Sequence, residues 1–264
     1  MRYVNEQDKL DRYINSFATQ SFRDQADRDY IAARLACRAE LMPQFLWASQ
    51  QAIEKYLKAI LLYNRVKVPK LTHDLTILLR LTEKLPPTPF AIALGARSRK
   101  FIDHLATYGI NRYMEKPYYV AGHVLVDLDL AVWELRRYCQ VLNVFGKKLP
   151  PQEVKLLEQA FADLAISSAQ PRYKFRVQGG FLEEVLKKPT HPARAALLWH
   201  NAAYGSRKRA TVRVRDHMVA GNPLLYLYPE MLDELLKFVP LPGDLVKGYR
   251  EHLAEVQADP SKRP

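Results

Sequence analysis

The sequence predicts a mainly helical protein, with an antiparallel helical bundle over residues 1–149 and a smaller, basic α+β region over residues 150–264. Apolar residues recur every three or four positions through most of the first half, as they do on the buried face of a helix. Prolines and short polar loops separate these segments, and such short connections are typical of antiparallel bundles. In the second half, basic and apolar residues alternate strictly over Arg172–Gln178, which indicates a β-strand with a basic outer face.

The first two helices of the bundle are expected over residues 24–41 and, after Pro43, over residues 45–64. The second has an apolar stripe that comprises Phe45, Ala48, Ala52, Ile53, Tyr56, Leu57, Ile60 and Leu61. Thr72 is expected to cap a third helix, with Asp74 in its first turn, where a negative charge suits the helix dipole.

Two more helices complete the predicted bundle. One spans about residues 90–108, after a break made by closely spaced prolines. The last spans about residues 118–143 and ends before Gly146. Further helices are predicted over residues 153–168, 181–188, 191–204, 229–238 and 243–256, and a second alternating segment over residues 209–215. If the two alternating segments pair, they form a short basic β element.

The charge balance is the one unusual feature of the composition. Lys and Arg number 40 against 28 Asp and Glu, which gives a formal net charge of +12 and favours an anionic partner, most often nucleic acid. The apolar runs are too short for a transmembrane helix, and the N-terminus lacks a signal-peptide pattern, so a cytoplasmic location is expected. Cys37 and Cys139 are expected to be reduced thiols, because their spacing fits no metal or redox motif.

Two motifs resemble those of a known family. The string QAIEKYLKAILL begins at Gln51, and THDL begins at Thr72. Together they are similar to the second helix and the start of the third helix of the HEPN domain (higher eukaryotes and prokaryotes nucleotide-binding). The resemblance covers about residues 24–146 and implies a helical bundle that dimerises. The C-terminal half shows no such resemblance.

Many HEPN domains are metal-independent ribonucleases with an Arg followed, after four to six residues, by a His. The resemblance implies that such a pair could be the catalytic site here. The spacing occurs at Arg97…His104, Arg99…His104 and Arg194…His200. About this many matches are expected by chance, so spacing does not decide. Helix geometry favours Arg97 and His104, because residues seven apart project in nearly the same direction. The alternative is a half-buried histidine that is hydrogen-bonded inside the bundle.

Two further candidates concern phosphate binding. Arg112 and Tyr113 are similar to an Arg-Tyr segment that precedes the last helix in many HEPN domains, where they would meet a phosphate and stack on a base. The alternative is a loop anchor. The basic side chains of the second half are the other candidate, as a phosphate-tracking surface or as a solvated strand face: Arg172, Lys174, Arg176, Arg207, Lys208, Arg209, Arg213 and Arg215.

These observations favour a module that binds RNA or nucleotide phosphates, with no cofactor or metal, in a toxin–antitoxin or defence setting. The first alternative is a metal-independent endoribonuclease that uses Arg97 and His104 as its catalytic pair. The second is a scaffold or partner of a nucleotidyltransferase, which the resemblance to minimal HEPN proteins implies. A homodimer is expected in each case, and no membrane association.

Overall fold

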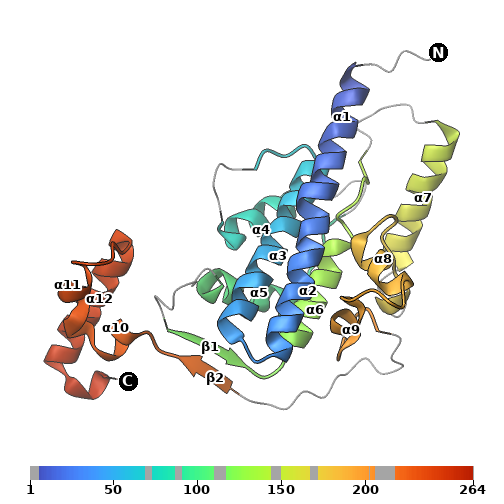
Figure 1. The fold of residues 1–264 in the computed structure, drawn as a ribbon. Helices are drawn as coiled ribbons and strands as arrows, with labels where there is room; N and C mark the ends of the chain where they lie inside the picture. Colours follow the sequence, from blue (N-terminus) through green and yellow to red (C-terminus); the bar gives the residue numbers. More distant parts are fainter. Residues whose placement is uncertain are drawn as a thin grey trace.

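A computed structural model describes residues 6–68, 73–86, 91–109, 117–143, 150–166, 172–201, 203–205 and 218–263. Helices dominate these residues, and a two-stranded antiparallel sheet accompanies them (Figure 1). The predicted mainly α fold with a small β element is therefore confirmed. Among the described helices, none combines the length and the apolar character that crossing a membrane requires.

The helical bundle is built by the first half of the chain. Its helices are α1 (Glu6–Phe17), α2 (Asp24–Arg38), α3 (Met42–Tyr63), α4 (Leu75–Glu83), α5 (Ala96–Tyr108) and α6 (Val124–Arg136). A π-helical segment, Ala18–Arg23, joins α1 to α2, so these elements form one long rod (Figure 1). Helix α3 lies at the centre, because it contacts α2, α4, α5 and α6.

The apolar stripe predicted for α3 is the core of the bundle. Phe45, Ile53, Tyr56 and Leu57 are completely buried, as their helical spacing predicts. Pro43 lies in the first turn of α3, where its missing N–H removes no helical hydrogen bond.

The start of α4 corrects one prediction. The helix begins at Leu75, and its N-cap is Asp74 rather than Thr72, which lies outside the described residues. The Asp74 carboxylate accepts hydrogen bonds from the backbone N–H groups of Thr76 at 2.8 Å and Ile77 at 3.2 Å. A carboxylate in this position satisfies N–H groups that have no partner within the helix.

The last predicted helix of the bundle, over residues 118–143, is wrong at both ends. Its first residues form strand β1 (Tyr118–Ala121), and α6 ends at Arg136. Strand β1 pairs antiparallel with β2 (Met218–Gly221), so that Tyr118 faces Gly221. A Cβ atom at position 221 would lie only 2.4 Å from the Tyr118 ring, so any other residue there would force that ring to move. The sheet thus joins the bundle to the C-terminal half.

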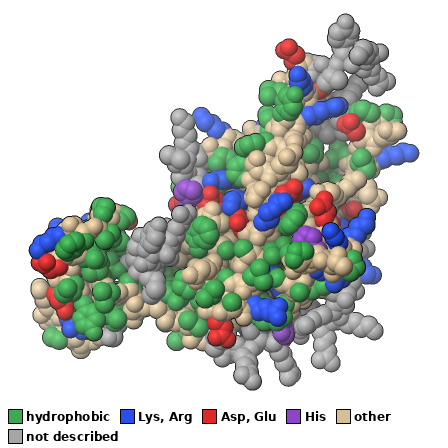
Figure 2. Space-filling model, viewed as in Figure 1, with side chains coloured by type: hydrophobic (Ala, Val, Ile, Leu, Met, Phe, Trp, Pro, Cys, Tyr) green, Lys and Arg blue, Asp and Glu red, His purple; other side chains and the backbone are tan. Residues whose placement is uncertain are grey.

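The C-terminal half contains short helices and turns: α7 (Pro151–Ile166), the 3₁₀ turn η2 (Arg172–Lys174), α8 (Phe181–Lys187), α9 (Arg194–Leu198), α10 (Leu224–Leu227), η3 (Pro229–Met231), α11 (Leu232–Leu235), α12 (Gly243–Ala258) and η4 (Pro260–Lys262). Helices α8 and α9 share the main hydrophobic core with the bundle. Helices α10–α12 enclose a separate small core, and hydrophobic side chains gather on this lobe in Figure 2. The division predicted at residue 149 stays a prediction.

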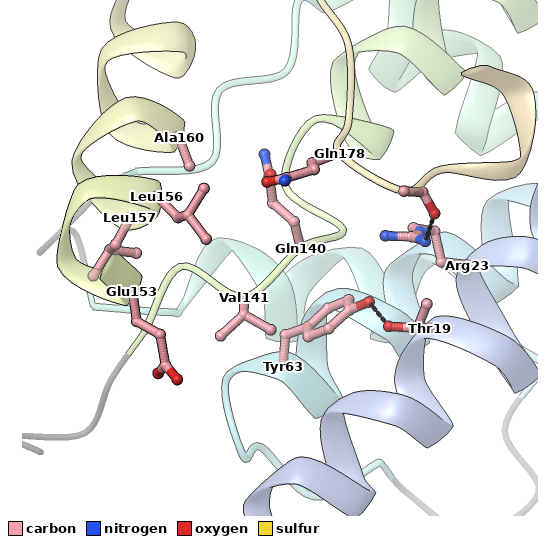
Figure 3. Close-up of a pocket in the computed structure, with 11 residues that line it drawn as sticks. Thr19, Arg23, Tyr63, Gln140, Val141, Glu153, Leu156, Leu157, Ala160 and Gln178 are labelled. Carbon is pink, nitrogen blue, oxygen red and sulfur yellow. Dashed lines mark hydrogen bonds between the residues drawn. The ribbon is translucent and has the colours of Figure 1, made fainter. Parts of the chain in front are cut away.

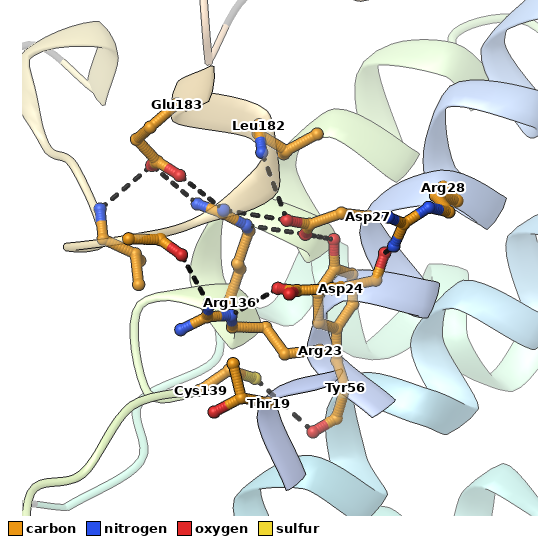
Figure 4. A network of polar contacts seen from close by, with 12 residues as sticks. Thr19, Arg23, Asp24, Asp27, Arg28, Tyr56, Arg136, Cys139, Leu182 and Glu183 are labelled. Carbon is orange, nitrogen blue, oxygen red and sulfur yellow. Dashed lines mark hydrogen bonds and ion pairs between the residues drawn. The ribbon is translucent and has the colours of Figure 1, made fainter. Parts of the chain in front are cut away.

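Buried charges fasten α8 to the bundle (Figure 4). Arg136 of α6 donates to both carboxylate oxygens of Asp27 on α2, at 2.7 and 2.9 Å, and to both of Glu183 on α8, at 2.8 and 2.6 Å. Asp27 also accepts from the Tyr56 hydroxyl at 2.6 Å and from the Leu182 N–H at 3.3 Å. Burial acts to lower the pKa of Arg136, but Asp27 and Glu183 outweigh it and raise that pKa.

A second buried network fastens α9. Asp129 of α6 accepts from the Tyr30 hydroxyl at 2.6 Å and forms an ion pair with Arg34. Arg34 also donates to the Ala196 carbonyl at 3.0 Å, and Asn201 donates to the Tyr30 hydroxyl at 2.8 Å. Because both networks cross from the bundle to residues 182–201, this part of the C-terminal half has a fixed position on the bundle.

Candidate functional site

Arg97 and His104 both lie on α5, and Asp127 of α6 interacts with each of them. Arg97 lies in the first turn of α5 and forms an ion pair with Asp127 of α6 through its Nε atom. His104 lies two turns further along, and the negative charge of Asp127 acts to raise the pKa of its ring. No bond between the two candidate residues is seen, but Asp127 interacts with both: it pairs with Arg97, and its charge acts on the pKa of His104.

His104 lies in an aromatic environment. Its ring centroid is 4.8 Å from that of Tyr108 and 5.1 Å from that of Tyr119, and these two tyrosine rings also touch. Burial lowers the pKa of His104, although a hydrogen bond with the Tyr119 backbone and the charge of Asp127 oppose the shift. Its buried Nε2 atom has no hydrogen-bond partner among the described residues. His104 is thus a neutral ring at neutral pH, with one nitrogen unused.

Two arginines, Arg137 and Arg172, lie over the ring of Trp133 of α6, and the charge of a third, Arg97, acts on Arg172. We name Arg97, Arg137 and Arg172 the arginine cluster. The guanidinium carbon lies 4.8 Å from the Trp133 ring centroid for Arg137 and 5.4 Å for Arg172. The indole Nε1 donates to the Arg172 carbonyl at 3.3 Å and so holds η2 against α6. Trp133 therefore positions the backbone that carries Arg172.

The other charges of the arginine cluster act on Arg172. Burial lowers the pKa of Arg172; Glu134 opposes this shift, and the positive charges of Arg137 and Arg97 add to it. Unlike Arg97, the half-buried Arg172 guanidinium makes no hydrogen bond or ion pair with any residue in the described part of the chain. Such a group is ready to bind an anion.

The other basic candidates have different outcomes. The predicted strand over Arg172–Gln178 is wrong, because the segment begins as the turn η2 and Phe175 packs edge-on against Trp133. Lys174 and Arg176 are exposed, and Arg176 donates to the Phe175 carbonyl at 2.8 Å. The remaining basic and aromatic candidates lie outside the described residues: Arg112, Tyr113, Arg207, Lys208, Arg209, Arg213 and Arg215.

The two motifs that carry the family resemblance meet in space, which motif recognition alone did not reveal. The His73 Nδ1 atom lies 3.1 Å from both carboxylate oxygens of Glu54, and Lys58 donates to Glu54 at 2.6 Å. Gln50 bonds to Glu54 at 3.1 Å and to the His73 carbonyl at 3.2 Å. Burial acts to raise the pKa of Glu54, but hydrogen bonds from Lys58 and His73 outweigh it and lower that pKa. Helical spacing predicts the Glu54–Lys58 pair, whereas its contact with His73 depends on the fold.

The described part of the chain contains no group of three or more His, Cys, Asp or Glu side chains that could hold a metal ion.

Comparison with known protein families finds a similarity over one part of the chain. Residues 19–119 match the family model for the HEPN domain. The match spans α2 to α5 and includes both motifs, Arg97 and His104, but it ends before α6, which supplies Asp127 and Trp133. No curated protein and no solved structure matches the sequence. Over residues 19–119, the chain is therefore similar to a HEPN domain.

Proposed function

We propose that this protein binds the phosphates of RNA or of a nucleotide at the arginine cluster. The observation that carries the proposal is the guanidinium of Arg172, which has no hydrogen-bond or ion-pair partner among the described residues and whose pKa is lowered by burial and also by the charges of Arg137 and Arg97. A phosphate oxygen placed there would relieve this repulsion and accept hydrogen bonds from the planar guanidinium.

The surroundings of Arg172 suit a nucleic acid backbone. A guanidinium that lies over an aromatic ring, as that of Arg172 lies over Trp133, can still donate hydrogen bonds from the N–H groups at its edge. Lys174 and Arg176 extend the positive surface along the chain from Arg172, and both are exposed. Successive phosphates would follow this row of basic groups, and the affinity would depend strongly on salt.

The test is binding of a fluorescently labelled single-stranded RNA, measured by anisotropy over a series of salt concentrations. We expect Arg172→Ala to weaken binding about tenfold and to reduce the slope of log K against log salt by about one phosphate contact. Lys247→Ala is the matched control, because Lys247 is exposed on α12 and its ion pair with Glu251 is long, at 3.8 Å. Equal binding by wild type and Arg172→Ala, or equal weakening by both variants, would contradict the proposal.

A second candidate function is metal-independent RNA cleavage, which the state of His104 favours. A neutral ring with an unused Nε2 atom could accept the proton of a 2′-hydroxyl, and Arg97 could stabilise the phosphate if it left Asp127. The same RNA, incubated in EDTA and separated on a gel, tests this function. Cleavage by wild type that His104→Ala abolishes, while RNA binding persists, would establish the ribonuclease activity. Intact RNA after incubation with either protein would contradict that activity and leave RNA binding as the proposed function.

The wider setting of the proposed function follows from the HEPN resemblance. A homodimer, a toxin–antitoxin or defence role, and partnership with a nucleotidyltransferase remain proposals of this kind. Partnership with a nucleotidyltransferase predicts that such an enzyme, once purified, forms a stable complex with the protein whether or not RNA is present.

A further inference from the structure

A pocket of about 450 Å3 opens between the bundle and α7 (Figure 3). Its walls come from the π-helical segment, the end of α3, the chain after α6, helix α7 and the loop before α8. The volume lies in the range of sites that hold small organic molecules. No residue of the arginine cluster and neither His104 nor His73 lines it, so the proposed function does not account for it.

One end of the pocket is polar and carries the guanidinium of Arg23, which forms an ion pair with Asp24 through one of its nitrogens. The Arg23 side chain is only 5% exposed; its Nε atom lies 3.0 Å from Asp24, and its Nη2 atom donates to the Gly179 carbonyl at 2.9 Å. Its Nη1 atom makes no hydrogen bond with any residue in the described ranges, and Figure 3 shows the guanidinium extending toward Gln140 and Gln178. A buried, fixed guanidinium with spare N–H groups is suited to one anionic head group.

The opposite wall is apolar and incompletely covered. Leu156, Leu157 and Ala160 of α7 line it together with Val141. No residue of α7 is fully buried; Leu156 is 53% exposed and Val141 is 45% exposed. When a ligand covers apolar side chains that still contact water, the removal of their surface from water favours binding.

The remaining walls restrict the head group. Tyr63 and Thr19 share a hydrogen bond of 2.6 Å, which fixes the tyrosine ring, and burial raises the pKa of Tyr63 to about 12 so that its hydroxyl stays neutral. Glu153 is exposed at the rim of the pocket and would repel a second acidic group. The pocket therefore favours a single anionic group.

We propose that this pocket binds a small amphipathic anion, with one carboxylate or phosphate at Arg23 and an apolar body against α7.

The test uses the full chain and titration calorimetry with octanoate, phenyl phosphate, octanol and inorganic phosphate as probes. We expect octanoate or phenyl phosphate to bind, and the preferred one identifies the head group. Octanol should bind at least tenfold more weakly because it lacks the charge, and inorganic phosphate because it lacks the apolar body. Failure of both amphipathic anions to bind wild type, or equal binding of octanol or of inorganic phosphate, would overturn the proposal.

Variants locate the binding. Leu156→Asp places a negative charge on the pocket wall at a half-exposed position, so the fold should tolerate it, and we expect at least tenfold weaker binding of the preferred probe. Val154→Asp is the matched control, since Val154 lies on the same helix and does not line the pocket. Arg23→Gln should also abolish binding, with circular dichroism as the check on folding. Unchanged binding by Leu156→Asp would place the probe elsewhere and refute the proposed site.

Discussion

At the scale of single residues, burial and partners give two histidines different properties. The His73 side chain is 64% exposed and rests its Nδ1 atom against a buried carboxylate, Glu54. His104 is half-buried among tyrosines, with a lowered pKa. A buried imidazole resists protonation because the charged ring loses its hydration, so His104 titrates below the usual value of about 6.5.

The causes of the His104 pKa shift predict the effect of replacing Asp127. The charge of Asp127 favours the protonated ring, so Asp127→Asn should lower the pKa of His104 further. NMR titration of the ring protons measures this shift directly. The same depressed pKa makes the folded state lose stability as the pH falls below about 6.5, because the unfolded chain then binds the proton more readily.

Asp103→Asn is the control for that titration. Asp103 neighbours His104 in sequence, but it is exposed and is not among the groups that shift the pKa of His104. A fall in the His104 pKa in Asp127→Asn, with no comparable change in Asp103→Asn, fits the proposed geometry. Equal shifts in both variants, or a rise in Asp127→Asn, would show that Asp127 does not act on the ring.

At the scale of elements, local patterns predict helices better than they predict contacts. The stripe of α3 follows from sequence because helical periodicity is a local property. The alternation over Arg172–Gln178 is equally regular, yet packing of Phe175 on Trp133 and the bond from the indole to Arg172 hold that segment as a turn. The sheet instead pairs β1 with β2, which lie almost 100 positions apart in the chain.

The candidate site shows the same limit. Arg97 and Arg172 were predicted separately, one from its spacing to a histidine and one from an alternating basic segment. Their proximity, and the parts played by Trp133 and Arg137, depend on how α6 packs and could not be read from spacing. Helical periodicity places all these residues on elements, but only the tertiary fold brings the elements together.

The contact between α6 and α8 leads to a stability prediction. Arg136→Met should lower the free energy of unfolding by about 3–5 kcal/mol, because Asp27 and Glu183 would remain buried without their cation. Urea unfolding followed by circular dichroism measures the change. Arg250→Met removes an exposed, long ion pair with Asp233 and should change stability by less than about 0.5 kcal/mol. Similar losses in both variants would mean that the network contributes no more than a surface pair.

At the scale of the whole molecule, the two hydrophobic cores divide the chain differently from its composition. The main core unites the bundle with α8 and α9 through Leu182, Val185 and Leu197. The small core of α10–α12 contains Leu225, Leu232, Leu245 and Tyr249. The HEPN match alone, over residues 19–119, includes neither α6 nor the C-terminal helices that complete the main core. The arginine cluster likewise needs residues from both halves of the chain.

This division predicts unequal effects of two truncations. A chain that ends at Asn222 keeps the main core, both strands and the buried networks, and should unfold cooperatively near the wild-type temperature. A chain that ends at Leu149 loses Glu183 and the apolar side chains of α8 and α9, so Arg136 and its neighbours become exposed. We expect that shorter chain to melt at a clearly lower temperature or without cooperativity when followed by circular dichroism. RNA binding should follow the same order, because only the chain that ends at Asn222 retains Arg172. If the chain that ends at Leu149 melted like wild type, residues 1–149 would be an independent domain and the second half an appendage to it.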